Sequence, residues 1–516
     1  MNRSARLLIA LSLCSALLNG VPLALGWRGD ALAQPAPTQL ARIWIVGATV
    51  ISPERADAGR KQAVLIEGDR IAQVVNALPA GAGEGATVVQ ADGLFLIPGL
   101  IDGHTHLQSV PGLTPLMTYR HPLLTKAYRA QLPRSFLRYG YTTVIDLILV
   151  DRAVLDGFEQ APLHPDLYHC GPGVVVPNGY PSQNAPSLLR NRVFPNYVLE
   201  PDANGKAAGG KQAGGVSAEE AAAHTPAAAV ARVKQSGGIC LKTFFERGFG
   251  RDKNLPVPSP ELFAGIVKAA HAAGLPVLLH ASSIEAQGFG LDGGTDVFVH
   301  GLWNWGEFNG EKALPAPAKA VLDRVIAQRI GYMPTMQVLG GLRVLYEPDY
   351  FDGPGVRRVV PKSLLDWYRS RAGQWFKDEM ANGASDEKMR TIFDAILARS
   401  AESTGYLAQH GAHFLFGTDT PSGPTPGNLP GINAYLEMQR LVAAKVSLRQ
   451  LFQAATLSNA RAFGLADRIG TIEPGKRANL LLLRRSPLES VEAYDAIHSI
   501  WLGGKRLEPE KLEAGE

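Results

Sequence analysis

The sequence contains little cysteine, no concentrated positive charge and, beyond its N-terminus, no long apolar run. Only 3 of its 516 residues are cysteine, which excludes a fold held together mainly by disulfides. The formal net charge is +4 and no run rich in Lys or Arg occurs, so a nucleic-acid partner is not expected. With 46% hydrophobic and 19% charged residues, the chain can form a large core, and global disorder is not expected.

The N-terminal segment is the one long apolar stretch, from residue 7 to residue 25. Two arginines precede it, and Ala31-Leu32-Ala33 follows it with small residues at the spacing that a signal peptidase reads. We therefore expect residues 1–33 to be a cleaved signal peptide. The mature chain would then begin at Gln34 and be exported, either to the periplasm or as a secreted protein. A retained membrane anchor is the alternative, but a glycine and a proline interrupt the apolar run.

Cleavage would leave two cysteines, Cys170 and Cys240, and no segment long and apolar enough to span a bilayer. The two cysteines could pair in an oxidising compartment. Two buried thiols are the simpler expectation for so large a chain.

The two ends of the mature chain share a texture of short apolar runs broken by glycine and aspartate. Runs of this length and composition are typical of β-strands. We interpret residues 40–97 and 463–516 as the two parts of one small β-sandwich domain built from both termini.

The middle of the chain, residues 98–462, alternates short apolar strands with Ala/Leu-rich helical stretches. The segment 260–275 before the strand PVLLH is a helix-to-strand unit, with Gly274 as its stop. Seven such strands together with LFLIPGLIDGH make eight. This number predicts an α/β fold with an eight-stranded (β/α) TIM-like barrel.

Two segments of the middle differ from this alternation. Residues 200–216 are rich in Gly, Ala and Lys, which predicts a mobile loop. Residues 343–405 carry tryptophans and charges at helical spacing, which predicts an amphipathic addition after the seventh strand. The addition could form a lid or cover the barrel wall.

Six polar residues stand at or near the C-terminal ends of the predicted strands. They are His104, His106, Lys242, His280, His300 and Asp419. Because the strand ends of an α/β barrel surround one mouth, these side chains are expected to converge. Imidazole and carboxylate are suitable ligands for zinc, manganese or iron. A single histidine at a strand end is usually structural, but four of them together with an aspartate and a strand-embedded lysine are hard to explain by packing.

This pattern resembles the amidohydrolase superfamily in its two-metal subtype, which has a lysine on the fourth strand. The shared order is Asp-x-His-x-His, Lys, His, His and Asp on strands one, four, five, six and eight. FLIPGLIDGHTHL resembles the family's strand-one signature, and ATLSNARAFGLADRIGTIEPGKRANLLLL resembles its C-terminal return into the β-domain. The resemblance covers residues 40–515 and is nearest to imidazolonepropionase-like and Xaa-Pro dipeptidase-like members.

The resemblance implies two divalent metal ions, most simply zinc. His104, His106 and Asp419 would hold a buried ion, and His280 and His300 a more exposed one. Two ions would activate a shared water and polarise a substrate carbonyl. As the catalytic residue, Asp419 would take the proton of that water and pass it to the departing amine.

The resemblance also gives Lys242 a role, as the lysine that reacts with carbon dioxide and bridges both ions as an N6-carboxylated carbamate. A protonated lysine would repel two divalent ions, whereas a carbamate is an anionic oxygen ligand. A neutral or ion-paired lysine in a one-metal site is the alternative.

The function implied is an exported hydrolase of carbon–nitrogen bonds whose substrate is a small amide, cyclic amide, dipeptide or N-acyl amino acid. Arg247, shortly after the fourth strand, could clamp a substrate carboxylate. It could equally pair with Glu246 or lie in solvent. The sequence does not decide whether the chain forms a homo-oligomer.

Two other functions remain open. A one-metal deaminase or cyclic-amidine hydrolase on the same barrel is disfavoured, because those relatives usually have a glutamate soon after the fifth-strand histidine. Here Glu285 lies five positions beyond His280. A non-catalytic exported binding protein that retains a metal is disfavoured because all six ligands are present.

Overall fold

The computed structural model describes residues 40–200, 217–249 and 253–515. The expected signal peptide, residues 1–33, and residues 201–216 of the predicted loop lie outside the described residues. In the described segments, no helix has both the length and the apolar character needed to cross a membrane.

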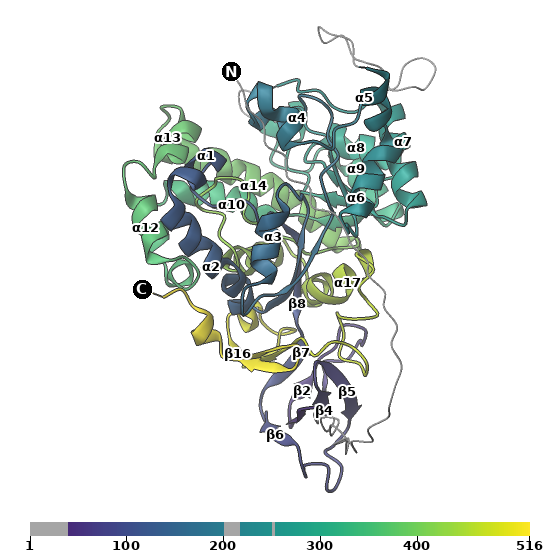
Figure 1. The fold of residues 1–516 in the computed structure, drawn as a ribbon, viewed down its shortest axis with the longest axis vertical. Coiled ribbons are helices and arrows are strands. Elements are labelled where there is room, and N and C mark those ends of the chain that lie inside the picture. Colours follow the sequence, from purple (N-terminus) through teal and green to yellow (C-terminus); the bar gives the residue numbers. More distant parts are fainter. Residues whose placement is uncertain (1–39, 201–216, 250–252, 516) are drawn as a thin grey trace, which may run out of the picture. The chain divides into compact units, whose positions relative to one another are not determined.

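Strands from both ends of the chain form two sheets. The first, in the order β5-β4-β1-β6, contains β1 (Arg42–Val46), β4 (Ala63–Glu67), β5 (Arg70–Val75) and β6 (Thr87–Gln90). The second, in the order β17-β16-β15-β7-β2-β3, contains β2 (Thr49–Val50), β3 (Arg60–Lys61), β7 (Phe95–Pro98), β15 (Leu480–Leu483), β16 (Ile497–Leu502) and β17 (Lys505–Leu507). Figure 1 shows the yellow C-terminal strand β16 near β7, and β15 pairs with both of them.

Strand β15 consists of four consecutive leucines, and burial on both of its faces explains this run. Leu480 and Leu482 join the core shared with the first sheet, whereas Leu481 and Leu483 join the large core on the other side. Alternate side chains of a strand point to opposite faces, so a strand buried on both faces becomes a continuous apolar run. The second sheet therefore packs against apolar residues on both of its faces.

The middle of the chain supplies parallel strands in two groups. The first group, in the order β10-β9-β8, contains β8 (Leu100–Thr105), β9 (Tyr141–Asp146) and β10 (Asp166–His169). The second, in the order β11-β12-β13-β14, contains β11 (Leu241–Phe244), β12 (Val277–His280), β13 (Val297–Val299) and β14 (Gly331–Met333). Each of these strands except β10 and β11 contributes at least one buried side chain to a shared cluster. Cys170, directly after β10, and Cys240, directly before β11, belong to the same cluster. This is a mixed α/β architecture of the TIM-barrel type with a second, β-rich domain.

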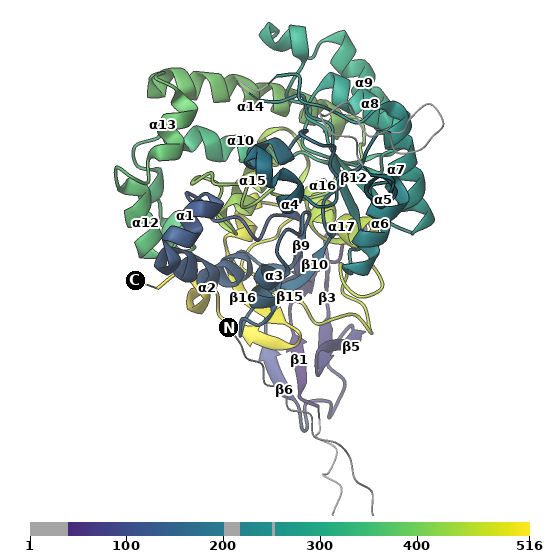
Figure 2. The same cartoon turned by 45° about the horizontal axis from the view of Figure 1, so that its top comes forward.

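Helices follow most of these strands. They are α1 (Pro115–Arg120), α2 (Pro122–Arg138), α3 (Arg152–Glu159), α4 (Arg190–Val193), α5 (Ala218–Ala223), α6 (Pro226–Gln235), α7 (Pro260–Ala272), α8 (Ile284–Gly293), α9 (Ala316–Ala327), α10 (Met336–Arg343), α11 (Pro354–Arg357), α12 (Lys362–Arg369), α13 (Trp375–Ala381), α14 (Asp386–Gln409), α15 (Ile432–Ala443), α16 (Leu448–Gln453) and α17 (Asn459–Ala462). In both views (Figures 1 and 2), α5 to α9 stay together on one flank and α12 and α13 on the opposite flank. The predicted unit before PVLLH is confirmed as α7, which is followed by Gly274 at a φ of 68°.

Two strand predictions need correction. LFLIPGLIDGH is not one barrel strand: it splits at Gly99 into β7, which joins the second sheet, and β8. A Cβ at Gly99 would come within 2.0 Å of Thr142 Oγ1, so only glycine fits this crossing. HFLFGTD is an extended segment with a single bridge at Phe414, followed by another bridge at Thr420, rather than a continuous strand.

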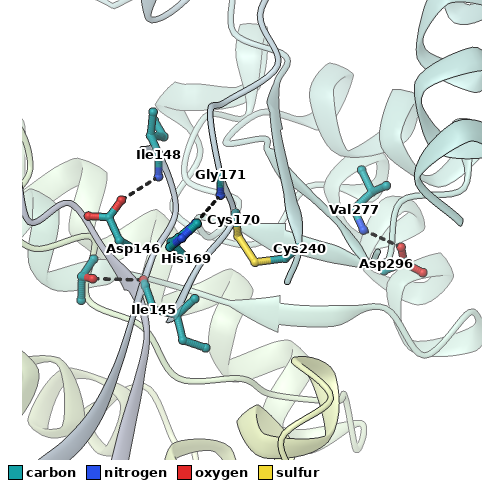
Figure 3. Close-up of a disulfide and its surroundings, with 10 residues drawn as sticks. Ile145, Asp146, Ile148, His169, Cys170, Gly171, Cys240, Val277 and Asp296 are labelled. Atoms are coloured by element: carbon teal, nitrogen blue, oxygen red, sulfur yellow. Dashed lines mark hydrogen bonds between the residues drawn. A yellow bond between two sulfur atoms is a disulfide. The ribbon is translucent and has the colours of Figure 1, made fainter. Parts of the chain in front are cut away.

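The expectation of two buried thiols is wrong. Cys170 follows β10, Cys240 precedes β11, and the two form a disulfide (Figure 3). Their Cα atoms lie 4.4 Å apart although 70 positions separate them in the sequence. Pairing therefore depends on the side-by-side placement of the two strands, which the spacing of the cysteines does not reveal.

The predicted addition, residues 343–405, is helical and has its own small core around Leu345, Tyr346 and Phe393. Trp367 and Trp375 both donate their indole N–H to the carbonyl oxygen of Gly112, at 3.3 and 3.0 Å. The addition thus contacts the loop that follows β8. Its role as a lid stays a prediction.

Candidate metal centre

Three of the predicted ligands meet where β8 and the segment 413–419 end. Asp419 Oδ1 lies 3.1 Å from His104 Nε2 and 2.8 Å from His106 Nε2, and the two nitrogens are 3.3 Å apart. Within the described part of the chain, these residues form the one group of three or more His, Cys, Asp or Glu side chains whose ligand atoms lie within 4.8 Å of one another. Two nitrogens aimed at each other and at one oxygen fit a divalent cation, which would satisfy all three atoms at once.

The other predicted ligands lie beside this group. The ring of His300 is 5.3 Å from that of His104 and 4.3 Å from that of His280, measured between centroids. Lys242 is 1% exposed, and its charge lowers the pKa of His104, His280 and His300. The structure therefore brings together all six residues that the sequence singles out.

Neighbouring side chains leave one ring nitrogen of each outer histidine for a ligand. His280 Nε2 lies 3.4 Å from Glu246 Oε2, and His300 Nδ1 lies 2.8 Å from Thr335 Oγ1. The nitrogens outside these contacts are Nδ1 of His280 and Nε2 of His300. Hydrogen bonds of this kind fix the tautomer and the orientation of a ligating imidazole.

Burial controls the protonation of the centre. Burial lowers the pKa of His104 to about 3 and also holds the pKa values of His280 and His300 below their usual range. The pKa of Lys242 falls to about 7 for the same reason, with the charge of Asp419 opposing the shift. Burial would raise the pKa of Asp419, but the imidazoles of His104 and His106 hold it well below its ordinary value. Neutral imidazoles beside an ionised carboxylate are the forms that bind metals.

Backbone geometry aims two of the ligands in a way that the sequence does not show. His300 and Asp419 adopt positive φ angles of 106° and 56°. Such conformations are strained for residues with a Cβ, and each costs roughly 1–3 kcal/mol. Thr418, next to Asp419, donates its hydroxyl to the buried Asp102 at 2.7 Å, so β8 holds the strained turn in place.

Arg247, the predicted carboxylate clamp, lies at the surface. Its guanidinium donates to both oxygens of Glu285, at 2.8 to 3.2 Å, and both side chains are about half exposed. Its partner is therefore not Glu246, which is the alternative considered from the sequence. Binding of a substrate carboxylate by Arg247 stays a prediction.

Sequence reasoning missed three residues that hold the ligands. Glu246 contacts His280 and accepts hydrogen bonds from Ser282 Oγ at 3.0 Å and from the backbone N–H of Gly248 at 2.9 Å. Thr335 contacts His300 as described above. Asp146, at the end of β9, accepts hydrogen bonds from two backbone N–H groups. One belongs to Leu107, directly after His106, at 2.6 Å, and the other to Ile148, at 3.1 Å. An acidic residue at the end of a strand, or two positions beyond it, was the available signal for Asp146 and Glu246.

Comparison with known families and curated proteins gives two kinds of match. The Amidohydrolase family model matches residues 95–292 and 379–507. A 5'-deoxyadenosine deaminase from Methanothermobacter thermautotrophicus is 48% identical, but only over 60 residues, which are 11% of this chain and 14% of that protein. A dihydroorotase from Trichlorobacter lovleyi is 21% identical over 478 residues, which cover 89% of this chain and 94% of that protein.

Solved structures match over most of the chain. A Xaa-Pro dipeptidase with methionine in its active site has a TM-score of 0.60 at 17% identity, covering 91% of this chain and 100% of that one. The ochratoxinase of A. niger has a TM-score of 0.62 at 19% identity, covering 91% and 96%. Phenylurea hydrolase B has a TM-score of 0.60 at 21% identity, covering 91% and 97%. At these identities the likeness establishes the fold alone.

Proposed function

Because the chain belongs to the amidohydrolase family, we propose that it is a metal-dependent hydrolase of carbon–nitrogen bonds in small amides. The observation that carries this proposal is the convergence of His104, His106 and Asp419 within 4.8 Å. Polar groups gathered at the C-terminal ends of barrel strands are the usual site of chemistry in such folds.

The proposal includes a closed barrel of eight strands. Hydrogen bonds across the gaps between the two groups of strands support it. The backbone N–H of Val174, in the segment after β10, donates to the carbonyl of Lys242 on β11 at 2.9 Å. Beyond β14, Leu415 N donates to Tyr332 O, and Gly103 N on β8 donates to Phe416 O, at 2.9 and 3.0 Å. The proposed domain limits remain 40–97, 98–462 and 463–516.

We assign two divalent ions, zinc in the first instance, to this centre. His104, His106 and Asp419 would hold one ion, and His280 and His300 the other. Bound divalent cations supply Lewis acidity, which lowers the pKa of water and polarises a carbonyl.

An N6-carboxylated Lys242 would complete the ligand set. A buried ammonium group among three histidines and two cations would be destabilised by repulsion, whereas a carbamate supplies negative oxygens between them. The burial of Lys242 beside these rings supports this assignment.

Asp419 would move the proton of the reaction. Its carboxylate is ionised in its surroundings and lies between β8 and the segment 413–419. It would accept a proton from the attacking water and deliver it to the nitrogen of the departing amine, so that a neutral amine leaves.

The substrate class that we propose is an amide, a cyclic amide, a dipeptide or an N-acyl amino acid. The matched structures include a dipeptidase and a phenylurea hydrolase by their names. Export after cleavage before Gln34 is part of the same proposal, and the Cys170–Cys240 disulfide supports it because disulfides persist in oxidising compartments. Mass spectrometry of the exported protein tests it: an intact Met1 would reject cleavage.

Metal analysis combined with substrate screening tests the function. Protein purified without chelator should contain close to two equivalents of metal and should hydrolyse part of a panel of N-acyl amino acids and dipeptides. Chelation should abolish turnover, and added zinc should restore it. A fully active one-metal form would reject the binuclear site, and metal-loaded protein that hydrolyses no amide of the panel would reject the function.

A further inference from the structure

Aromatic side chains from three separate loops gather beside His280. Tyr180 lies in the loop after β10, Phe249 in the loop after β11, and Trp303 in the loop after β13. Loops that follow barrel strands on this side are where substrate groups bind in barrels of this type.

The rings form a continuous series that leads away from the metal centre. The centroid of Tyr180 is 4.6 Å from that of His280 and 5.5 Å from that of Phe249, and Phe249 is 5.8 Å from Trp303. Phe244, at the end of β11, supports Tyr180 from the protein interior at 5.8 Å and is only 6% exposed. The inner end of the series therefore lies against the buried His280, a proposed ligand.

The outer end of the series is open to solvent. Phe249 is 41% exposed, although it contacts both Tyr180 and Trp303. Covering an exposed aromatic ring with another apolar group is favourable, because it removes apolar surface from water. A ligand that reaches His280 along these rings would supply that cover.

Two charged groups nearby, Arg247 and Glu246, are already engaged, and Lys242, whose Nζ lies 5.2 Å from the centroid of Phe244, is only 1% exposed. The guanidinium of Arg247 is held by Glu285, and the carboxylate of Glu246 by His280, Ser282 Oγ and the N–H of Gly248. The rings thus present an uncharged surface next to paired charges, which favours a neutral ligand over an ionic one.

We propose that Tyr180, Phe249 and Trp303 form a subsite for a neutral apolar group of the substrate, preferably an aromatic ring, directly beside the scissile amide. This inference rests on the proposed amidohydrolase function. The selected substrates are amides with an aryl or bulky apolar group on one side of the carbon–nitrogen bond.

Paired ligands and substrates test the subsite on the metal-loaded protein. Titration calorimetry should give benzamide a Kd about 30-fold lower than that of acetamide, about 2 kcal/mol at 1.4 kcal/mol per tenfold. Of benzoylglycine and acetylphenylalanine, one should exceed acetylglycine in kcat/KM by a similar factor. The Phe249→Ala variant should reduce both ratios to less than about fivefold, and Phe249→Leu should retain most of the preference.

Tyr119→Ala is the matched control, because Tyr119 is an exposed aromatic residue on α1. It should leave both ratios unchanged. Equal Kd values for benzamide and acetamide, or ratios that survive Phe249→Ala, would overturn the subsite even if amides are hydrolysed. Tighter binding of tetramethylammonium than of benzamide would also overturn it. A 30-fold Kd ratio without hydrolysis of any amide would support the subsite and reject the proposed reaction.

Discussion

The two halves of the candidate centre differ in how completely the protein alone assembles them. At β8, a carboxylate lies between two imidazoles, and Asp419 Oδ1 is within 3.1 Å of both Nε2 atoms. At β11 to β13, two imidazoles and a lysine amine lie near one another, and the charge of Lys242 lowers the pKa of both His280 and His300. The first half holds a carboxylate between its imidazoles, whereas the described residues include no comparable group of imidazole and carboxylate ligand atoms at the second half.

This difference suggests what each half needs in order to bind metal. Asp419 between two imidazoles already gives the first half an anionic oxygen ligand and two nitrogen ligands for a cation. The second half depends on Glu246 and Thr335 to orient its histidines, and on a carbamate to supply negative charge. Substitutions should therefore affect chemistry most in the first half and metal retention most in the second.

Asp419→Asn should have the largest effect, a loss on the order of 10²–10⁴ in turnover. Asparagine offers a carbonyl oxygen to a metal but accepts no proton at neutral pH, so much of the metal should remain. Kinetics, metal analysis and thermal melting of the variant check this. Asp292→Asn, which changes an exposed aspartate paired with Arg324, should be unaffected. Near-normal turnover in a folded Asp419→Asn protein would leave Asp419 as a ligand only.

Lys242→Ala should lose the second half of the centre and retain the first. Metal content is expected to fall from two equivalents toward one, with a loss of turnover that short-chain carboxylates partly restore. The carboxylate would replace the missing anion between the ions. Lys319→Ala, at an exposed helical lysine paired with Asp323, is the control. Full activity and full metal content after Lys242→Ala would contradict the carbamate assignment.

Glu246→Gln should weaken metal binding at the second half by about 10- to 100-fold, the usual effect of losing a partner of a ligating histidine. Glutamine keeps the size of the side chain but is a weaker partner for the N–H of His280. Competition with a chelator measures the affinity of each equivalent. Glu285→Gln is the matched control, since Glu285 is an exposed glutamate that contacts Arg247 instead. Equal affinities in the two variants would remove Glu246 from the centre without affecting the proposed reaction.

Glu437→Gln should have the smallest effect, a change in the stability of the fold that depends on pH. The carboxylate of Glu437 accepts from the backbone N–H of Gln337 at 2.6 Å, at the start of α10 and just beyond Thr335. Burial raises its pKa from 4.5 to about 7. The folded state therefore binds a proton that the unfolded chain releases, and stability is lost as pH rises from about 5 through 7.

Denaturant unfolding of wild type and Glu437→Gln between pH 5 and pH 7 measures this effect. The free energy of unfolding of the wild type should fall relative to the variant by on the order of 2 kcal/mol across that range. Parallel pH profiles would show that Glu437 does not titrate between these limits.

Much of the fold could be predicted because its signals are local. Strand-length apolar runs mark β9 to β14, and Gly274 marks the end of the helix before β12. The predictions failed where a contact with a residue distant in the sequence determines the local structure. Gly99 divides an apolar run because Thr142 leaves no room for a Cβ, and Cys170 pairs with Cys240 because β10 and β11 lie side by side.

The sequence by itself determined which residue types stand at the strand ends, because a strand that ends in His, Lys or Asp is visible in one dimension. It thereby identified the six side chains that converge, including His104, His300 and Asp419. Only the tertiary structure decided how these side chains are oriented and which neighbours they contact. His300 and Asp419 adopt positive φ angles, and Glu246 contacts His280. Arg247 forms an ion pair with Glu285. These features depend on which loops lie next to one another around the barrel mouth, and no local pattern of residues specifies that neighbourhood.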